Sequence, residues 1–478
     1  MTKINLMTKT SPKTNNKKSC KIVITNDDAS FNRFVEKSES RLELHLGKGK
    51  DKLTPRTFRL FIRKVIRTAI AQKLTVIDWV VDKDFYDFIE NLDDKYNTEW
   101  VFKTLAENIK LANYKFEKFN TEKKADSNIG LKEINIFSTV DKKVGSAFSM
   151  GLKIGEAINY TRDLSNTPAN HMSPDIMVKN IKKVFAKTGI KIKVIDYPTL
   201  KKMGAGLLAA VGQGAKEKSK LVILEWQGIK PLSKNKPHVL LGKGVTFDSG
   251  GLNVKPSGHM HDMHMDMTGA ATVLGAMLAV SALKLKKNVV AVVPIAENAI
   301  SENSMRAGDI VTSLSGKTVE VLHTDAEGRM ILADAITYAI KHYKPKYMID
   351  VATLTGASLV ALGKQASALF ANNEKLRSDL LMLSEVSGDL LWPLPLWSEY
   401  EPILKGTRSD LTNIANDFSR FGGCIEGAIF LKNFADKNIP WAHIDIAPRM
   451  ESIPTDNLEK GATGEPVRLL LEYIMISK

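Results

Sequence analysis

The stretch Leu241–Gly269, LGKGVTFDSGGLNVKPSGHMHDMHMDMTG, decides the fold of this chain. It begins at the end of an apolar strand, continues through a glycine-rich turn, and ends where an apolar helix begins. Lys243 follows the strand, Asp248 and Lys255 lie in and after the turn, and Asp266 directly precedes the helix. The stretch therefore predicts an α/β unit with charged side chains where its elements meet.

Short apolar strands and helical runs alternate on both sides of this stretch. The predicted strands are Leu221–Trp226, His238–Lys243, Asn288–Pro294, Lys346–Thr353 and Trp441–Ala447. The predicted helices are Thr268–Leu283, Ile331–His342 and Glu465–Ile476. Because strands that are apolar throughout are buried on both faces, we expect an α/β fold in which helices flank a central sheet, and we expect that sheet to be mixed.

The first third of the chain predicts a smaller α/β domain of its own. Leu53–Asn120 alternates amphipathic runs with short apolar ones, and Ala147–Asn166 is typical of a connecting helix. A chain of 478 residues is also longer than the roughly 250–300 residues that one core supports. We therefore expect an N-terminal α/β domain with a basic tail in residues 1–165 and a larger catalytic domain in residues 166–478.

Composition excludes several classes of protein. Hydrophobic residues make up 44% and charged residues 25%, which excludes a disordered or fibrous chain. The two cysteines, Cys20 and Cys424, are too few for a disulfide framework or a cysteine-based zinc module. This usage fits a reducing compartment, so we expect a cytoplasmic protein.

The N-terminus carries basic residues without a continuous apolar run, and no Arg precedes Arg33. We expect a disordered basic tail there, in preference to a secretory signal or a transit peptide. The apolar stretch Thr268–Leu283 is shorter than the roughly 20 residues of a membrane span, so we expect no membrane partner.

The formal charge of +15 is concentrated toward the N-terminus. Residues 1–150 hold 29 basic and 20 acidic residues, a net charge of +9. A basic surface attracts nucleic acid, and a Lys-rich coding bias produces the same excess. DNA binding therefore stays open as a second hypothesis, which steeply salt-dependent binding would support.

A second informative stretch is Leu322–Asp334, LHTDAEGRMILAD. Asp325, Glu327 and Arg329 alternate in it, and their side chains would share one side if the backbone were extended. Arg329 also lies where a helical run begins, and backbone donors at such a place can hold an anion.

Together the two stretches supply four carboxylates, which repel one another unless cations offset them. Two divalent ions provide that charge, and oxygen ligands suit Mg²⁺, Mn²⁺ or Zn²⁺. Such a pair can share a bridging hydroxide, which leaves peptidase and phosphoesterase chemistry both open. The four carboxylates are those of Asp248, Asp266, Asp325 and Glu327.

Three histidines between the strand and the helix are the other candidates for metal ligands. They are His259, His261 and His264, and the segment begins as a loop at Lys255-Pro256-Ser257-Gly258. Because nothing in that loop fixes the imidazoles on one face, we interpret them as solvated residues or as residues at the rim of a pocket.

The motifs TDAEGR at Thr324–Arg329 and GKGVTFDSGG at Gly242–Gly251 resemble those of the leucine aminopeptidase family of two-metal exopeptidases. The similarity runs from about Asn159 to the C-terminus and includes DVATLTGA at Asp350–Ala357 and WAHIDIA at Trp441–Ala447. The resemblance implies removal of N-terminal residues from peptides, with Leu favoured, through a hydroxide held between two Mn²⁺ or Zn²⁺ ions. It also implies a homo-hexamer whose active sites face a shared interior.

The resemblance assigns a role to each metal ligand. Asp248 and Glu327 correspond to the ligands that bridge both ions. Asp325 corresponds to the residue that completes the more readily exchanged site. Lys243 and Asp266 correspond to the ligands that complete the tighter site.

The resemblance also implies the catalytic groups and the substrate pocket. Lys255 corresponds to the lysine that contacts the bridging water and the scissile carbonyl, and Arg329 to the arginine that holds a bicarbonate general base. The pocket for the first side chain would be formed by Met263, Thr353, Leu354, Gly356, Ala357, Ala447 and Met450.

Two departures from the family pattern lie close to these positions. His323 stands where the family usually has Asn, and Pro448-Arg449 stands where it usually has Gly. Pro fixes φ and lacks a backbone donor, so the second departure affects the expected shape of the pocket.

Overall fold

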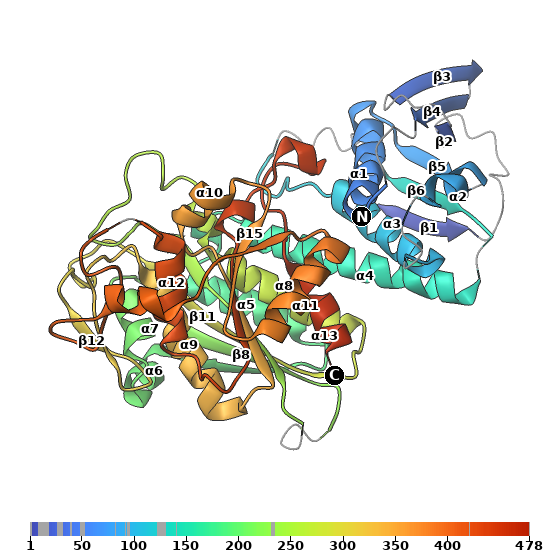
Figure 1. Cartoon of the computed structure of the whole chain (residues 1–478). Helices are drawn as coiled ribbons and strands as arrows, with labels where there is room; N and C mark the ends of the chain where they lie inside the picture. The colour runs from blue at the N-terminus through green and yellow to red at the C-terminus, as the bar shows by residue number, and fades with distance from the viewer. Residues whose placement is uncertain are drawn as a thin grey trace. The chain divides into compact units, whose positions relative to one another are not determined.

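The computed structural model describes residues 2–7, 19–25, 32–38, 41–47, 53–81, 83–90, 92, 96–121, 131–139, 141–230, 235–419 and 421–477. The chain forms two compact units (Figure 1). One comprises Met1–Glu156 and Ile453–Lys460, and the other comprises Ala157–Ser452 and Gly461–Lys478. The chain passes between them within the long helix α4 (Lys142–Ser165), at whose end the predicted boundary lies.

The first unit is built on a six-stranded sheet in the order β1-β6-β5-β2-β4-β3. All its pairings are parallel except that of the edge strand β3 with β4. Its elements are β1 (Lys3–Met7), β2 (Ser19–Thr25), β3 (Asn32–Ser38), β4 (Arg41–Gly47), β5 (Val76–Val80), β6 (Glu133–Phe137), α1 (Pro55–Ala71), α2 (Lys83–Ile89) and α3 (Thr98–Ala112).

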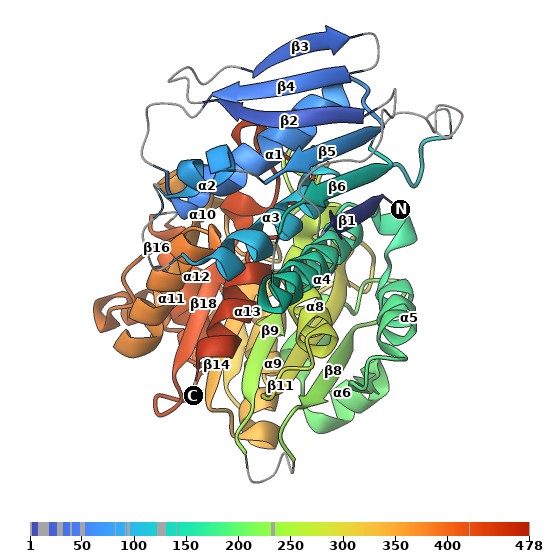
Figure 2. The same cartoon turned by 90° about the vertical axis from the view of Figure 1, so that its right-hand side faces the viewer.

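The expected disordered tail is wrong for its first residues. Lys3–Met7 form β1, which runs beside β6 as a parallel strand (Figure 2). Pairing with β6 satisfies the backbone hydrogen bonds of Ile4–Met7. This segment is largely apolar, but the basic residues on either side make it look like part of a basic tail. Residues 8–18 of the tail lie outside the described part of the chain.

The second unit is built on a nine-stranded mixed sheet in the order β16-β15-β18-β14-β9-β11-β8-β7, with β10 paired to β11. The central strands β18, β14, β9 and β11 are parallel, and antiparallel neighbours flank them. The strands are β7 (Lys191–Ile195), β8 (Lys220–Gln227), β9 (His238–Gly242), β10 (Gly244–Asp248), β11 (Asn288–Asn298), β14 (Tyr347–Ala352), β15 (Ser367–Ala371), β16 (Leu391–Pro393) and β18 (Trp441–Asp445). The expected α/β fold with a mixed central sheet is confirmed.

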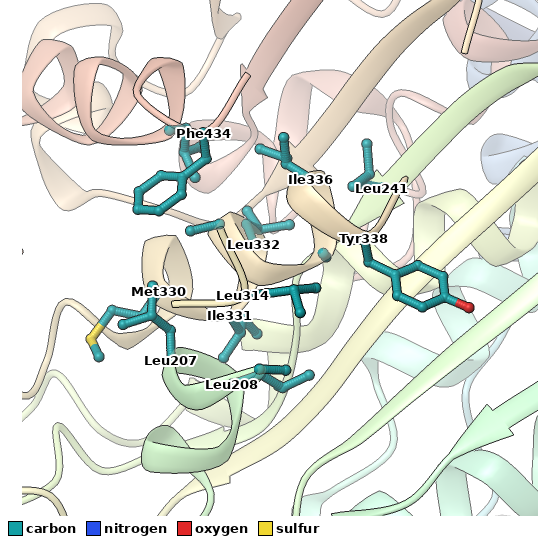
Figure 3. Close-up of a cluster of buried hydrophobic side chains, with 14 of the residues drawn as sticks. Leu207, Leu208, Leu241, Leu314, Met330, Ile331, Leu332, Ile336, Tyr338 and Phe434 are labelled. Carbon is teal, nitrogen blue, oxygen red and sulfur yellow. The ribbon is translucent and has the colours of Figure 1, made fainter. Parts of the chain in front are cut away.

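Helices cover both faces of this sheet. Val239 and Leu241 of β9 pack into the cluster around α9 (Glu327–Tyr343) and α7 (Gly206–Val211). Figure 3 shows Leu207 and Leu208 of α7 beside Met330 and Ile331 of α9. Because successive strand residues point to opposite faces, Leu240 faces the other side, where α8 (Thr268–Ala282) contacts β9 and β14. The other main helices are α5 (Pro174–Phe185), α6 (Tyr197–Met203), α10 (Gly356–Leu362), α11 (Glu374–Ser387), α12 (Gly423–Lys432) and α13 (Val467–Ile476).

Helix α8 is apolar on all sides. In the part of the chain that the structure describes, Met263–Ala282 is the one helical run long and apolar enough to cross a membrane, and it is almost entirely buried inside the fold. A helix that is apolar all round and packed on every side is a core helix.

Candidate active site

The charged residues of the two informative stretches lie where parallel strands end. Lys243 directly follows β9, Asp248 ends β10, and Thr353 directly follows β14. Asp266 lies in the short 3₁₀ helix η3 (Met263–Met267), and Glu327 is the first residue of α9. The carboxyl ends of parallel strands meet at one edge of a sheet, and this topology brings together residues that are distant in sequence.

Lys243 is the buried centre of the first half of the site. Its Nζ lies 2.8 Å from Asp266 Oδ2 and 2.9 Å from Glu327 Oε1. It also donates a hydrogen bond of 2.8 Å to the carbonyl oxygen of Thr353. With side-chain exposures of 3%, 6% and 2%, Lys243, Asp266 and Glu327 form an ion-paired group that water hardly reaches.

Lys255 links the other two carboxylates. Its Nζ lies 2.7 Å from Asp248 Oδ2 and 2.6 Å from Asp325 Oδ1. Oxygen atoms of Asp248, Asp325 and Glu327 all lie within 4.8 Å of one another. The four carboxylates and two lysines picked out in the sequence therefore converge in one place.

Burial and mutual repulsion shift the ionisation of these carboxylates. Burial and the nearby charges of Asp248 and Glu327 raise the pKa of Asp325 to about 7. Burial likewise raises the pKa of Glu327 and of Asp266 above the usual range. For Lys243 and Lys255, burial lowers the pKa but the surrounding carboxylates raise it by more, so both amines stay charged.

The donor set fits divalent metal ions. When all four carboxylates are ionised, their charge exceeds that of the two lysines by two. Glu327 Oε2 is buried and has no hydrogen-bond partner within the described residues. A cation stabilises a buried, ionised carboxylate oxygen that has no donor, and hard divalent ions prefer such oxygen ligands.

Two glycine-dependent contacts make the site possible. A Cβ on Gly328 would lie 2.5 Å from Lys243 Cε and 2.7 Å from its Nζ. Gly250 has φ of +86°, and a Cβ there would lie 2.4 Å from Asn253 O. The close approach of α9 to Lys243 and the tight turn after Asp248 therefore both require the absence of a side chain.

The extended conformation considered for Asp325, Glu327 and Arg329 is wrong. Glu327 and Arg329 lie in the first turn of α9. Because each helical residue turns the chain by about 100°, these side chains, two positions apart, point about 200° apart around the helix axis. Arg329 is consequently directed elsewhere, and its Nη1 donates a 2.7 Å hydrogen bond to Asn413 O and pairs with Glu426. Its proposed part in holding bicarbonate stays a prediction.

The predicted pocket residues lie after β14, after β18 and in η3. Thr353 Oγ1 donates a 2.7 Å hydrogen bond to Asp266 Oδ1, which joins the pocket to the ion-paired group. Helix α10 contacts η5 (Ala447–Arg449), so the two walls are neighbours. Gly356 and Ala357 begin α10, Leu354 precedes it, Ala447 begins η5, and the half-buried Met263 and Met450 lie in η3 and directly after η5.

Sequence reasoning missed several residues that position the site. Asn298 ends β11, and its Nδ2 donates to Asp248 Oδ1 at 2.8 Å and to Thr324 O at 3.1 Å. Asp445 ends β18, and Glu426 pairs with Arg329. Asn298 and Asp445 could have been found in the sequence, because each is a polar residue at the end of an apolar strand. No comparable pattern marks Glu426.

The structure also locates the departures and the histidines. His323 Nδ1 accepts a 3.3 Å hydrogen bond from the backbone N–H of Asp325, beside the carboxylate group. His259 and His261 are exposed and His264 is half-buried, which agrees with their interpretation as solvated or rim residues.

Comparison with known proteins extends these observations. Residues 159–471 match the sequence profile of the catalytic domain of the cytosol aminopeptidase family. A probable cytosol aminopeptidase of Rickettsia canadensis (strain McKiel) is 39% identical over 425 residues, 89% of this chain and 83% of its own. One of Rickettsia rickettsii (strain Sheila Smith) is 38% identical over 443 residues, 92% of this chain and 86% of its own.

Solved structures show the same architecture. The bottromycin maturation enzyme BotP in complex with Mn matches with a TM-score of 0.83 and 29% identity, covering 96% of this chain and 98% of its own. A mutant of tomato leucine aminopeptidase matches with a TM-score of 0.86 and 26% identity, covering 100% of this chain and 97% of its own.

Proposed function

The chain belongs to the cytosol aminopeptidase family, and from this premise we propose how its site removes N-terminal residues from peptides. It is a metal-dependent aminopeptidase, a hydrolase whose substrates are peptides. We propose that Leu is its favoured N-terminal residue and that a hydroxide held between two ions attacks the peptide bond. The observation that carries this proposal is the convergence of Asp248, Asp325 and Glu327 beside two charged lysines.

Five side chains would hold two divalent ions, and we propose Mn²⁺ or Zn²⁺. The clustered carboxylate oxygens and the manganese bound to the similar BotP structure support a hard divalent ion. Bound ions supply a hydroxide at neutral pH by lowering the pKa of their water, and they polarise the scissile carbonyl. The five proposed ligands are Lys243, Asp248, Asp266, Asp325 and Glu327. The amine of Lys243 is charged in the metal-free chain, and it would have to lose its proton as the ion enters.

Lys255 is the proposed stabiliser of charge on the substrate. Its pKa is raised by the carboxylates around it despite its burial, so it carries a full charge at neutral pH. A fixed ammonium next to the attacked carbonyl stabilises the oxyanion that develops there. Its contacts with Asp248 and Asp325 hold this ammonium at the carboxylate group.

Arg329 is the proposed holder of a bicarbonate that shuttles the proton to the leaving amine. It lies in the first turn of α9, where free backbone donors and the helix dipole attract anions. The paired Glu426 partly neutralises its charge, which weakens that attraction. Bicarbonate dependence of the rate is therefore the direct test of this role.

Exopeptidase action follows from where the free amine can bind. The substrate amine would be held near Asp266, and a residue inside a peptide chain has no such amine to offer. Thr353, bonded to Asp266, begins the proposed pocket for the side chain of the first residue. The apolar Met263, Leu354, Ala357, Ala447 and Met450 suit Leu.

We also propose a cytoplasmic hexamer. Trp392, Trp397, Phe418 and Phe421 of the second unit are 61%, 64%, 63% and 91% exposed. Exposed apolar side chains that form one patch mark surfaces that associate, and the subunit number of six is taken from the family resemblance. Light scattering coupled to gel filtration would test the subunit number.

DNA binding stays a hypothesis that rests on the charge of residues 1–150.

A panel of fluorogenic aminoacyl substrates, run with Mn²⁺, Zn²⁺, Co²⁺ and Mg²⁺, tests the proposal. The metal content of the purified chain is measured alongside, and a phosphate ester serves as the control substrate. We expect activity to disappear on exhaustive chelation, to return with Mn²⁺ or Zn²⁺, and to be highest for Leu. Turnover that survives exhaustive chelation would contradict the metal-based reaction.

A further inference from the structure

Asp445 is a completely buried carboxylate with four hydrogen-bond donors around it. Its Oδ1 accepts from the backbone N–H groups of Leu354 at 3.0 Å and Ala447 at 3.2 Å. Its Oδ2 accepts from the N–H of Thr355 at 3.2 Å and from its hydroxyl at 2.7 Å. A single side chain therefore binds two segments that lie about 90 residues apart in sequence.

These two segments are the walls of the pocket proposed for the first substrate side chain. One follows β14 and carries Leu354, and the other follows β18 and carries Ala447. The strands are parallel neighbours, with Ala352 paired to Asp445, so both walls start beside this carboxylate. Thr355 is also the N-cap of α10, and its bond to Asp445 fixes where that helix begins.

Arg449 fixes the same walls at their other end. Its Nε and Nη2 pair with Glu465 at 2.9 and 2.7 Å, and its Nη1 donates a 2.7 Å hydrogen bond to Lys364 O. Lys364 follows α10 closely, whereas Arg449 ends η5. The pair Pro448-Arg449, which stands where the family usually has Gly, thus includes a buried arginine that ties η5 to the chain after α10.

With both ends anchored, the separation of α10 from η5 depends on the bonds that Asp445 accepts. All four of its partners are donors, so a carboxylate satisfies them and an amide cannot. An NH₂ group in place of Oδ1 would release the wall of Ala447 and face the N–H of Leu354. In place of Oδ2 it would face the N–H of Thr355, so either orientation places a donor against a donor.

We propose that Asp445 is a positioning residue that sets the width of the first-residue pocket and thereby the preference for Leu over smaller side chains. The proposal rests on the aminopeptidase function proposed above. Asp445 acts through Leu354, Thr355 and Ala447 and needs no contact with the substrate.

The test compares Asp445→Asn with the matched control Asp334→Asn in the full chain loaded with Mn²⁺. Asp334 is also buried and accepts backbone N–H groups on both oxygens, including those of Leu208 at 2.9 Å and Leu314 at 2.7 Å. The measured quantity is kcat/KM for leucyl and alanyl anilides. We expect Asp445→Asn to lower the leucine-to-alanine ratio about tenfold, mainly through a higher KM for the leucyl substrate. The control should keep the wild-type ratio.

Equal losses for both substrates in Asp445→Asn, or the same change of ratio in the control, would overturn the proposal. If Asp445→Asn does not fold, Thr355→Val removes the hydroxyl that donates to Asp445 and caps α10 by accepting from the N–H of Ser358, and Thr355→Ser restores it. A ratio that falls in the Val variant and returns in the Ser variant supports the proposal, and an unchanged ratio in the Val variant overturns it. Wild-type protein that cleaves neither anilide would instead overturn the aminopeptidase function, and with it the pocket.

Discussion

The Nζ atom of Lys243 lies 2.9 Å from Oε1 of Glu327, and both side chains are almost fully buried. A buried charge without its partner is strongly unfavourable. If the ammonium of Lys243 is removed, the buried carboxylates lose their counter-charge and the folded state is destabilised. We expect Lys243→Met to lower the free energy of unfolding of the metal-free chain by about 3–5 kcal/mol at pH 8. Urea unfolding measures this change.

The matched control is Lys375→Met, which breaks an exposed pair between Lys375 and Asp379 one helical turn apart. Such surface pairs contribute little, so the control should unfold like wild type. Equal urea midpoints for the two variants would show that Lys243 is not the counter-charge of a buried site.

Gly328→Ala tests the close approach of α9 to Lys243. The added Cβ would lie 2.5 Å from Lys243 Cε, and that amine is held by Asp266, Glu327 and Thr353. We expect a loss of about 1–3 kcal/mol in stability, as for other overpacked sites, together with weaker metal binding. Calorimetric titration with Mn²⁺ and urea unfolding measure the two effects.

The control for that substitution is Gly145→Ala in α4, where a Cβ would meet no atom within 4 Å. Because Ala has the higher helix propensity, this variant should be neutral or slightly more stable. A Gly328→Ala protein that behaves like Gly145→Ala would contradict the tight packing described at the site.

Much of the second unit could be predicted from the sequence because its strands are short, apolar and separated by clear turns. The predicted strand Asn288–Pro294 is confirmed as β11, but the strand continues to Asn298. The predicted helix Ile331–His342 is confirmed as α9, but it begins at Glu327. Glu327 and Arg329 resembled part of an extended strand because the first turn of α9 is charged. Without apolar residues at helical spacing, nothing in the sequence indicated a helix there.

The contacts that position the site were beyond sequence reasoning for a physical reason. Asn298 reaches Asp248 only because β10 pairs with β11, and Asp445 reaches Leu354 only because β18 pairs with β14. Single-sequence patterns give the elements and leave their lateral order open. The buried ion pair of Arg329 with Glu426 likewise depends on α12 packing against α9.

Asp325→Ala and Glu327→Ala each remove one proposed ligand. We expect either change to lower leucyl-anilide hydrolysis by more than about a hundredfold, because the loss of a ligand disturbs the metal more than the loss of its supporting contacts does. Circular dichroism should show a retained fold. The exposed Glu374→Ala in α11 serves as the control and should keep wild-type turnover. Full activity in both ligand variants would remove these residues from the metal site.

The ionisation of Asp325 predicts how metal binding and stability depend on pH. Burial raises its pKa to about 7 in the folded, metal-free chain, against an ordinary value of 3.8. A raised folded-state pKa favours the protonated form, so its contribution to stability is complete below about pH 4 and is lost as the pH rises through about 7. Lys243 and Lys255 stay charged over this range, because the carboxylates raise their pKa despite burial.

Divalent ions need the ionised carboxylate and therefore compete with this proton. We expect Mn²⁺ to raise the melting temperature by more at pH 8 than at pH 5. In the presence of a chelator, the wild-type chain should lose stability between these pH values relative to Asp325→Asn, whose side chain does not titrate. Differential scanning calorimetry of both proteins, with and without Mn²⁺, measures the two differences. An equal Mn²⁺ shift at both pH values would mean that no proton leaves the site when the ions enter, and Asp325 would then be ionised before they bind.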